Sequence, residues 1–240
     1  MRGSGLYKGG EMKGTLLLTA AVAVLLAAAA GASAVGAAAA GPAPGSAHLG
    51  VAQPVQTQGQ TTGVLYSQND NDTGTGVVSQ NFEPDFDVYD SQLADDFVVP
   101  NTGGPWQITG VTVTGVYFNG SGPAASENVT FYRDANGIPG VVKNTQTVVG
   151  ADTGGSFTIP LDKFALPAGH YWVSVQANMD FASGGEWGWE TRGVQSGSAA
   201  QWQNPGDGFG SGCTSWASVV SCVGFGPDLM FSLSGRVLGS

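Results

Sequence analysis

Basic residues are scarce in this chain of 240 residues, which has 8 Lys and Arg against 18 Asp and Glu. The formal net charge is −10 at pH 7. Beyond Ala34 the imbalance grows to −12, because 17 of the acids but five of the bases follow that residue. An acidic field of this size disfavours nucleic acid and anionic membrane surfaces as partners. It suits solubility and the binding of cations.

Histidine is also scarce, and this bears on enzymatic activity. A Ser-His-Asp site needs a histidine base, but His170 is the one histidine of the predicted folded part, and no G-x-S-x-G motif is present. We expect His170 at the surface or at a strand edge. Glu186 and Glu190 come nearest to a glycosidase pair, but four residues along a strand separate them by roughly 13 Å, whereas such pairs lie ~5–9.5 Å apart. We therefore expect no enzyme; an extracellular hydrolase is the least favoured alternative.

A long apolar run occurs near the amino terminus. Lys8 and Lys13 precede an uncharged run at 15–30, and Ala32-Ser33-Ala34 follows with small residues. This pattern is typical of a cleaved secretory signal; an uncleaved membrane anchor, which needs ~20 apolar residues, is the alternative. The predicted organisation is a signal peptide at 1–34, a flexible linker at 35–62 and one domain at 63–237. The mature domain is then secreted and needs no membrane.

Two cysteines, Cys213 and Cys222, have eight residues between them. In an exported chain, an even pair predicts a disulfide, which would contribute roughly 2–3 kcal/mol in the chain-entropy model. The alternative is two free thiols. The spacing and the lack of a nearby histidine disfavour a zinc site.

Helical periodicity is nearly absent from the predicted domain, and glycines separate short runs of β-type residues. The longest run is Trp106–Asn119, and Asp228–Val237 closes the domain. Gly169–Asn178 alternates so that Tyr171, Val173, Val175 and Ala177 would share one face. Nine or ten strands at this spacing predict an all-β, antiparallel β-sandwich of jelly-roll type, with a barrel as the alternative.

An acidic stretch runs from Asn69 to Pro100 and contains no Lys or Arg. Aromatic residues are threaded through it, which indicates an ordered frame rather than a disordered tail. Calcium takes six to eight oxygen ligands, and it would relieve the repulsion between crowded carboxylates. The alternative is a solvated acidic surface with Asx-turns. The candidate calcium ligands are Asp70, Asp72, Asp85, Asp87, Asp90, Asp95 and Asp96. Asp95 and Asp96 face opposite sides of a strand.

Three tryptophans are candidates for ligand binding. Trp187 and Trp189 lie two residues apart, so a strand places both on one face, and Trp202 is nearby in sequence. Sugar rings stack on exposed aromatic faces, while a few polar neighbours fix their orientation. The alternative is that the three rings fill the core. On the first interpretation, the ligand is an extracellular glycan.

Six segments carry a family resemblance: YDSQLADDFVVP, WQITGVTVTGVYFNGSGP, VTFYRDANGIPG, LPAGHYWVSVQA, WQNPGDGF and PDLMFSLSG. Together they are similar to the carbohydrate-binding-module-like β-sandwich domains that accompany bacterial secreted proteases, adhesive repeats and surface-anchored proteins. The resemblance covers about residues 63–235 and implies fold and export, but no activity. We thus predict a secreted, non-catalytic, calcium-stabilised binding module, with carbohydrate as the favoured ligand class. The alternative is a structural or cell-surface component without a small ligand.

Overall fold

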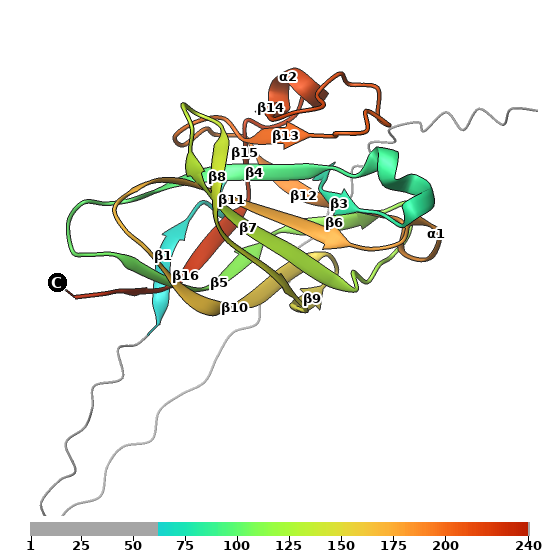
Figure 1. Cartoon of the computed structure of the whole chain (residues 1–240). Coiled ribbons are helices and arrows are strands. Elements are labelled where there is room, and N and C mark those ends of the chain that lie inside the picture. Colours follow the sequence, from blue (N-terminus) through green and yellow to red (C-terminus); the bar gives the residue numbers. More distant parts are fainter. Residues whose placement is uncertain (1–61, 240) are drawn as a thin grey trace, which may run out of the picture.

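A computed structural model describes residues 62–239 (Figure 1). The predicted signal peptide (1–34) lies outside the described residues, as does the predicted linker except for residue 62. Helical structure in the described part is limited to the 3-10 helix η1 (Pro84–Tyr89) and the short helices α1 (Phe181–Gly184) and α2 (Val219–Val223). None of these helices is long and apolar enough to span a membrane.

The strands form three sheets. The five-stranded sheet, at the bottom of Figure 1, has the order β1 (Gly63–Ser67), β16 (Phe231–Val237), β5 (Trp106–Val113), β10 (Ser156–Leu166) and β9 (Ala151–Thr153). The large sheet has the order β14 (Ala217–Ser218), β13 (Gln201–Gln203), β4 (Gln92–Val99), β11 (Gly169–Asn178), β7 (Ser126–Asp134) and β8 (Pro139–Val148), with β3 (Gln80–Asn81) beside β11. The small sheet has the order β15 (Asp228–Leu229), β12 (Glu186–Arg192) and β2 (Asp72–Val78), with β6 (Gly115–Phe118) beside β12. The predicted all-β antiparallel sandwich is confirmed.

The alternation predicted for β11 is confirmed as well. Tyr171, Val173, Val175 and Ala177 belong to the main hydrophobic core, whereas Trp172 belongs to a separate cluster on the opposite face. This strand therefore separates the core from the outer face of the large sheet. Successive residues of a strand point to opposite faces, so the outer face of β11 carries His170, Trp172, Ser174, Gln176 and Asn178.

The predicted run Trp106–Asn119 is two strands in different sheets. β5 ends at Val113, and β6 begins at Gly115 and pairs with β12. Glycine is required directly after the break, because a Cβ at Gly115 would lie 2.5 Å from Trp187 Nε1 and 2.7 Å from the carbonyl oxygen of Gly155. A larger residue does not fit where the chain passes from one sheet to the other.

The predicted disulfide is confirmed. Cys213 and Cys222 are bonded, and their Cα atoms lie 5.9 Å apart. The loop that they close contains Trp216, all of β14 and most of α2. Because β14 pairs with β13, the loop is fixed to the large sheet at one point and by the disulfide at another.

Candidate functional site

Trp187, Trp189 and Trp202 lie in the core, with exposed fractions of 0, 0 and 1%. The indole N–H of each donates to a backbone carbonyl, at 2.7–2.9 Å. Protein atoms surround the three rings, so a sugar cannot stack on them in this structure. The predicted ligand-binding role is corrected accordingly: the alternative, that these rings fill the core, is the one that the structure shows.

Some carboxylates of the acidic stretch are exposed to solvent, and others are buried. Asp85 and Asp87 are exposed on η1, Asp70 accepts from Arg192 Nε at 2.7 Å, and Asp90 accepts from a backbone N–H. Within residues 62–239, no group of three or more His, Cys, Asp and Glu side chains is arranged to hold a metal ion. Calcium binding in this stretch therefore stays a prediction.

Asp95 and Asp228 are two fully buried carboxyls. Asp95 Oδ2 accepts from Gln68 Nε2 at 2.6 Å and from a backbone N–H. Asp228 Oδ2 accepts from the Ser196 N–H at 2.5 Å and lies 3.7 Å from Arg192 Nη1, whereas its Oδ1 has no hydrogen-bond partner among the described residues. Burial, followed by repulsion from Asp228, raises the pKa of Asp95 well above its usual range. Burial also raises the pKa of Asp228 to about 6.

Asp72 lies beside another carboxyl rather than in a cluster of acids. It begins β2, and its charge acts on the carboxyl of Glu190 on β12. Burial, followed by the charge of Asp72, raises the pKa of Glu190 to about 7. Glu186, at the start of the same strand, instead accepts from the Asn119 side chain. The two glutamates of β12 thus have different neighbours: an amide beside Glu186 and the charge of Asp72 near Glu190.

The outer face of the large sheet carries four hydrogen-bonded side-chain amides: Asn81 of β3, Asn128 of β7, and Gln176 and Asn178 of β11. Asn178 Oδ1 accepts from Asn81 Nδ2 at 3.0 Å and from Asn128 Nδ2 at 2.9 Å. Gln176 Oε1 accepts from Asn128 Nδ2 at 3.2 Å. The three asparagines are partly exposed, so this amide network contacts solvent.

An aromatic cluster follows the amide network on the same face. It contains Trp172 and Tyr132, with Trp216 packed against them. The rings of Trp216 and Tyr132 meet edge to face, with centroids 5.9 Å apart. Of the six tryptophans, five are buried and Trp216 is half-buried. Sequence reasoning missed this cluster because its rings come from three distant segments.

His170 lies at the end of the same face, between two aspartates. Its Nε2 is 2.5 Å from Asp96 Oδ2, and its Nδ1 is 3.5 Å from Asp134 Oδ1. Asp96 also accepts from the Ser198 N–H at 2.8 Å, and Asp134 accepts from the Trp172 indole at 2.9 Å. Both carboxylates therefore hold neighbouring protein segments in place. As predicted, Asp95 and Asp96 point to opposite faces of β4, and each has its own partners.

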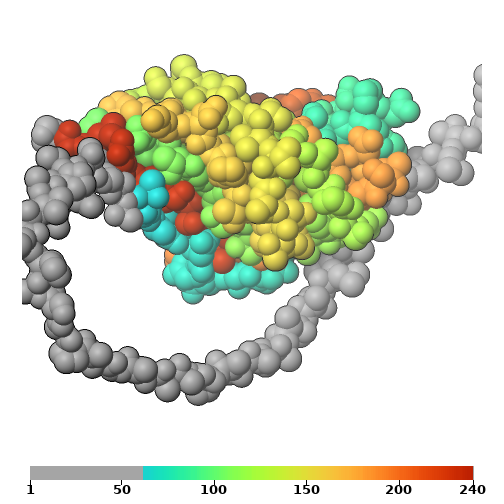
Figure 2. Space-filling view, turned by 90° about the horizontal axis from the view of Figure 1, so that it is seen from below, coloured from blue at the N-terminus to red at the C-terminus, as the bar shows by residue number. Residues whose placement is uncertain are grey.

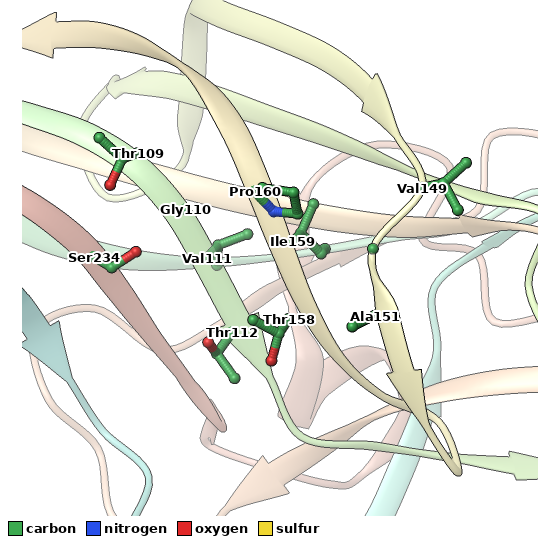
Figure 3. Close-up of a pocket in the computed structure, with 11 residues that line it drawn as sticks. Thr109, Gly110, Val111, Thr112, Val149, Ala151, Thr158, Ile159, Pro160 and Ser234 are labelled. Atoms are coloured by element: carbon green, nitrogen blue, oxygen red, sulfur yellow. The ribbon is translucent and has the colours of Figure 1, made fainter.

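The five-stranded sheet has a hollow of about 590 Å³ (Figure 3). Thr112 and Thr158 lie opposite each other on β5 and β10, and Thr109 and Ser234 add two further hydroxyls. A Cβ on Gly110 would lie 2.8 Å from Ser234 Oγ, so close strand packing requires glycine there. The described residues that line the hollow are uncharged and include no aromatic ring. Figure 2 views the molecule from below, with β9 and β10 in yellow on the near side.

No protein-family model and no curated protein sequence matches the chain. Among solved structures, it is similar to the cysteine protease and lectin-like domains of Cwp84, a surface layer associated protein of Clostridium difficile, at 14% identity and a TM-score of 0.42, over 62% of this chain and 32% of that chain. Clostridial Cwp84 after propeptide cleavage gives the same identity, TM-score and coverage of this chain, and 36% coverage of its own. The chain thus spans about a third of the length of the proteins it matches.

Proposed function

We propose that the domain is a non-catalytic extracellular binding module that recognises a neutral carbohydrate on the outer face of the large sheet. The observation that carries this proposal is the amide network. A side-chain amide offers two donors and an acceptor, and sugar hydroxyls both donate and accept hydrogen bonds. A few fixed polar groups of this kind are what gives a ligand site its specificity.

The amide network is held in place by protein contacts. Asn178 Nδ2 donates to Ser126 Oγ at 2.9 Å, and Asn128 Oδ1 accepts from Thr147 Oγ1 at 2.8 Å. The Gln176 amide donates to a backbone carbonyl at 2.9 Å. Polar groups that are already ordered lose little conformational entropy when a ligand binds. The network is therefore suited to recognising a defined arrangement of hydroxyls.

Charge favours a neutral ligand over an anionic one. The amide network contains no ionised group, and the chain has a net charge of −10. A sulfated or uronic-acid polymer would meet a repulsive field without a compensating base in the network. We therefore expect neutral glycans to bind in preference to acidic glycans of the same length.

Asn128→Ala tests the proposal. The change removes an amide that bonds Gln176, Asn178 and Thr147, and we expect at least about tenfold weaker binding of neutral glycans, measured first on a glycan array and then by calorimetry. The matched control is Thr158→Ala, which removes an exposed hydroxyl from the opposite sheet and is expected to bind as the native domain does. Unchanged affinity in Asn128→Ala contradicts the proposal. Lack of glycan binding by the native domain favours the alternative, a surface component without a small ligand.

Calcium is the cofactor that we propose for the acidic stretch. The charge balance of the interior supports it, because Asp95 of this stretch is buried near the carboxyl of Asp228, and Arg192 lies 3.7 Å from Asp228. Calcium would complete its shell with amide and backbone oxygens. We expect added calcium to raise the melting temperature of chelator-treated protein at pH 8, because a ligand of the native state stabilises it. Equal melting temperatures with calcium and with chelator contradict this proposal.

A further inference from the structure

We propose that Trp216 is the stacking platform of the carbohydrate site, where its ring holds one sugar unit while the amide network binds another unit of the same neutral oligosaccharide. The inference rests on the proposed carbohydrate function. It assigns the aromatic contact to Trp216 in place of Trp187, Trp189 and Trp202, whose rings are in the core.

The Trp216 ring is partly exposed and rests on a buried support. Trp216 is half-buried, so part of the indole is at the surface. Its support is rigid, because Tyr132 is 9% exposed and Trp172 is fully buried. Trp172 is further held by its indole N–H, which donates to Asp134. A flat apolar surface held on a buried base is the arrangement that stacks on a sugar ring at low entropic cost.

The loop that carries the Trp216 ring is held in place and carries no charge. The disulfide between Cys213 and Cys222 closes this loop. Ala217, the residue after Trp216, pairs with Trp202 of β13. The ring therefore follows directly on a residue that is fixed to the large sheet. Every residue between the two cysteines is uncharged, and four of them carry hydroxyls. In a strongly acidic chain, such a loop suits a neutral polar ligand.

A buried hydroxyl without a partner among the described residues lies between the two halves of the site. Ser174 lies on the outer face of β11, between Trp172 of the aromatic cluster and Gln176 of the amide network. It is 1% exposed, and its Oγ has no hydrogen-bond partner in the described part of the chain. Buried hydroxyls are almost always paired. Because protein atoms enclose this oxygen, its partner would be a buried water between the aromatic cluster and the amide network, and not the ligand itself.

The length of the ligand follows from the strand. Trp172 and Gln176 are four residues apart on β11, which corresponds to roughly 13 Å. A single sugar ring does not reach both the aromatic cluster and the amide network. The site therefore fits two or three linked sugars, and affinity is expected to rise with chain length and then level off.

The test measures dissociation constants by calorimetry for neutral glucan, mannan and N-acetylglucosamine oligomers of one to six sugars. For the tightest series, Trp216→Ala is expected to weaken binding of the longer oligomers about tenfold, ~1.4 kcal/mol. Trp216→Phe, which keeps a flat ring, is expected to stay within about threefold of native affinity. Thr112→Ala on the opposite sheet is the control for an unrelated surface change.

The outcomes separate this inference from the proposed function. If Asn128→Ala weakens binding and Trp216→Ala does not, the platform assignment is overturned and the carbohydrate function stands. If no oligomer binds the native domain, both are overturned. Tryptophan fluorescence gives a second readout that does not depend on the stability of the alanine variant. Ligand is expected to protect native protein from iodide quenching, and this protection is expected to be absent in Trp216→Phe, where the remaining tryptophans are buried.

Discussion

Replacing Trp187 with alanine is expected to destabilise the domain by about 3–5 kcal/mol, while the folded fraction keeps its glycan affinity. Trp187 is fully buried and stacks on Phe157, with ring centroids 4.8 Å apart. Its indole N–H donates to the carbonyl of Gly155 at 2.7 Å. Truncation would leave a large cavity and an unpaired buried carbonyl, and both raise the free energy of the native state.

Urea denaturation measures this loss directly. Trp187→Phe is the matched variant, because it keeps an aromatic ring but removes the N–H donor, and we expect it to cost less than the alanine change. Trp216→Ala is the contrasting variant, with a small loss of stability and a large loss of glycan affinity. The opposite result, in which Trp187→Ala unfolds like the native domain but no longer binds glycan, would restore Trp187 as a sugar platform and contradict the core assignment.

The alternation of apolar and polar residues predicted a strand well where the two faces of the strand differ clearly in polarity. β11 begins and ends where the sequence pattern places it, because alternation of apolar and polar residues reflects burial on one side. The spacing of Trp187 and Trp189 correctly predicted a shared face. It could not reveal that this face is the core, since an aromatic ring suits a buried site and a binding site equally well. β2 escaped prediction because its Asp, Thr and Gly residues have low strand propensity.

The candidate site could be predicted in part, one strand at a time. Gln176 and Asn178 alternate with core residues of β11, so their position on the outer face follows from the pattern. Asn81 and Asn128 lie beside them because of the order of the strands in the sheet, and a local sequence pattern does not predict that order. The same limit applies to Asp228, which has no acidic neighbour in the sequence. Its proximity to Asp95 arises because the next residue of β15, Leu229, donates its N–H to the Asp95 carboxyl on β4, and only tertiary structure brings the two carboxyls into one buried region.

Raising the pH from 5 to 8 in the presence of a chelator is expected to lower the melting temperature, on the order of 5 °C. Burial raises the pKa of Asp228 to about 6 and of Glu190 to about 7, and it raises that of Asp95 well above its usual range. Each group binds its proton more tightly in the folded chain than in the unfolded one. Its contribution is complete below the unfolded pKa, near 4, and is lost as the pH rises through the folded pKa. The pKa values of Asp70 and Glu83 are lowered, so the contributions of these two groups to stability change with pH below this range.

Asp228→Asn isolates the contribution of one of these three groups. Asparagine keeps an oxygen for the Ser196 N–H and brings an amide to the position of Oδ1, which has no partner in the native side chain among the described residues. Because the variant cannot ionise, we expect it to melt above the native domain at pH 8 and close to it at pH 5. Asp85→Asn, on the exposed helix η1, is the control and should leave the pH profile unchanged. A variant that melts below the native domain at pH 8 would show that the ionised carboxylate stabilises the fold through Arg192, which contradicts the expectation.

Added calcium provides the final comparison. If the ion neutralises these carboxyls, it raises the melting temperature of the native domain at pH 8 more than that of Asp228→Asn, because the variant has one carboxylate fewer for the ion to neutralise.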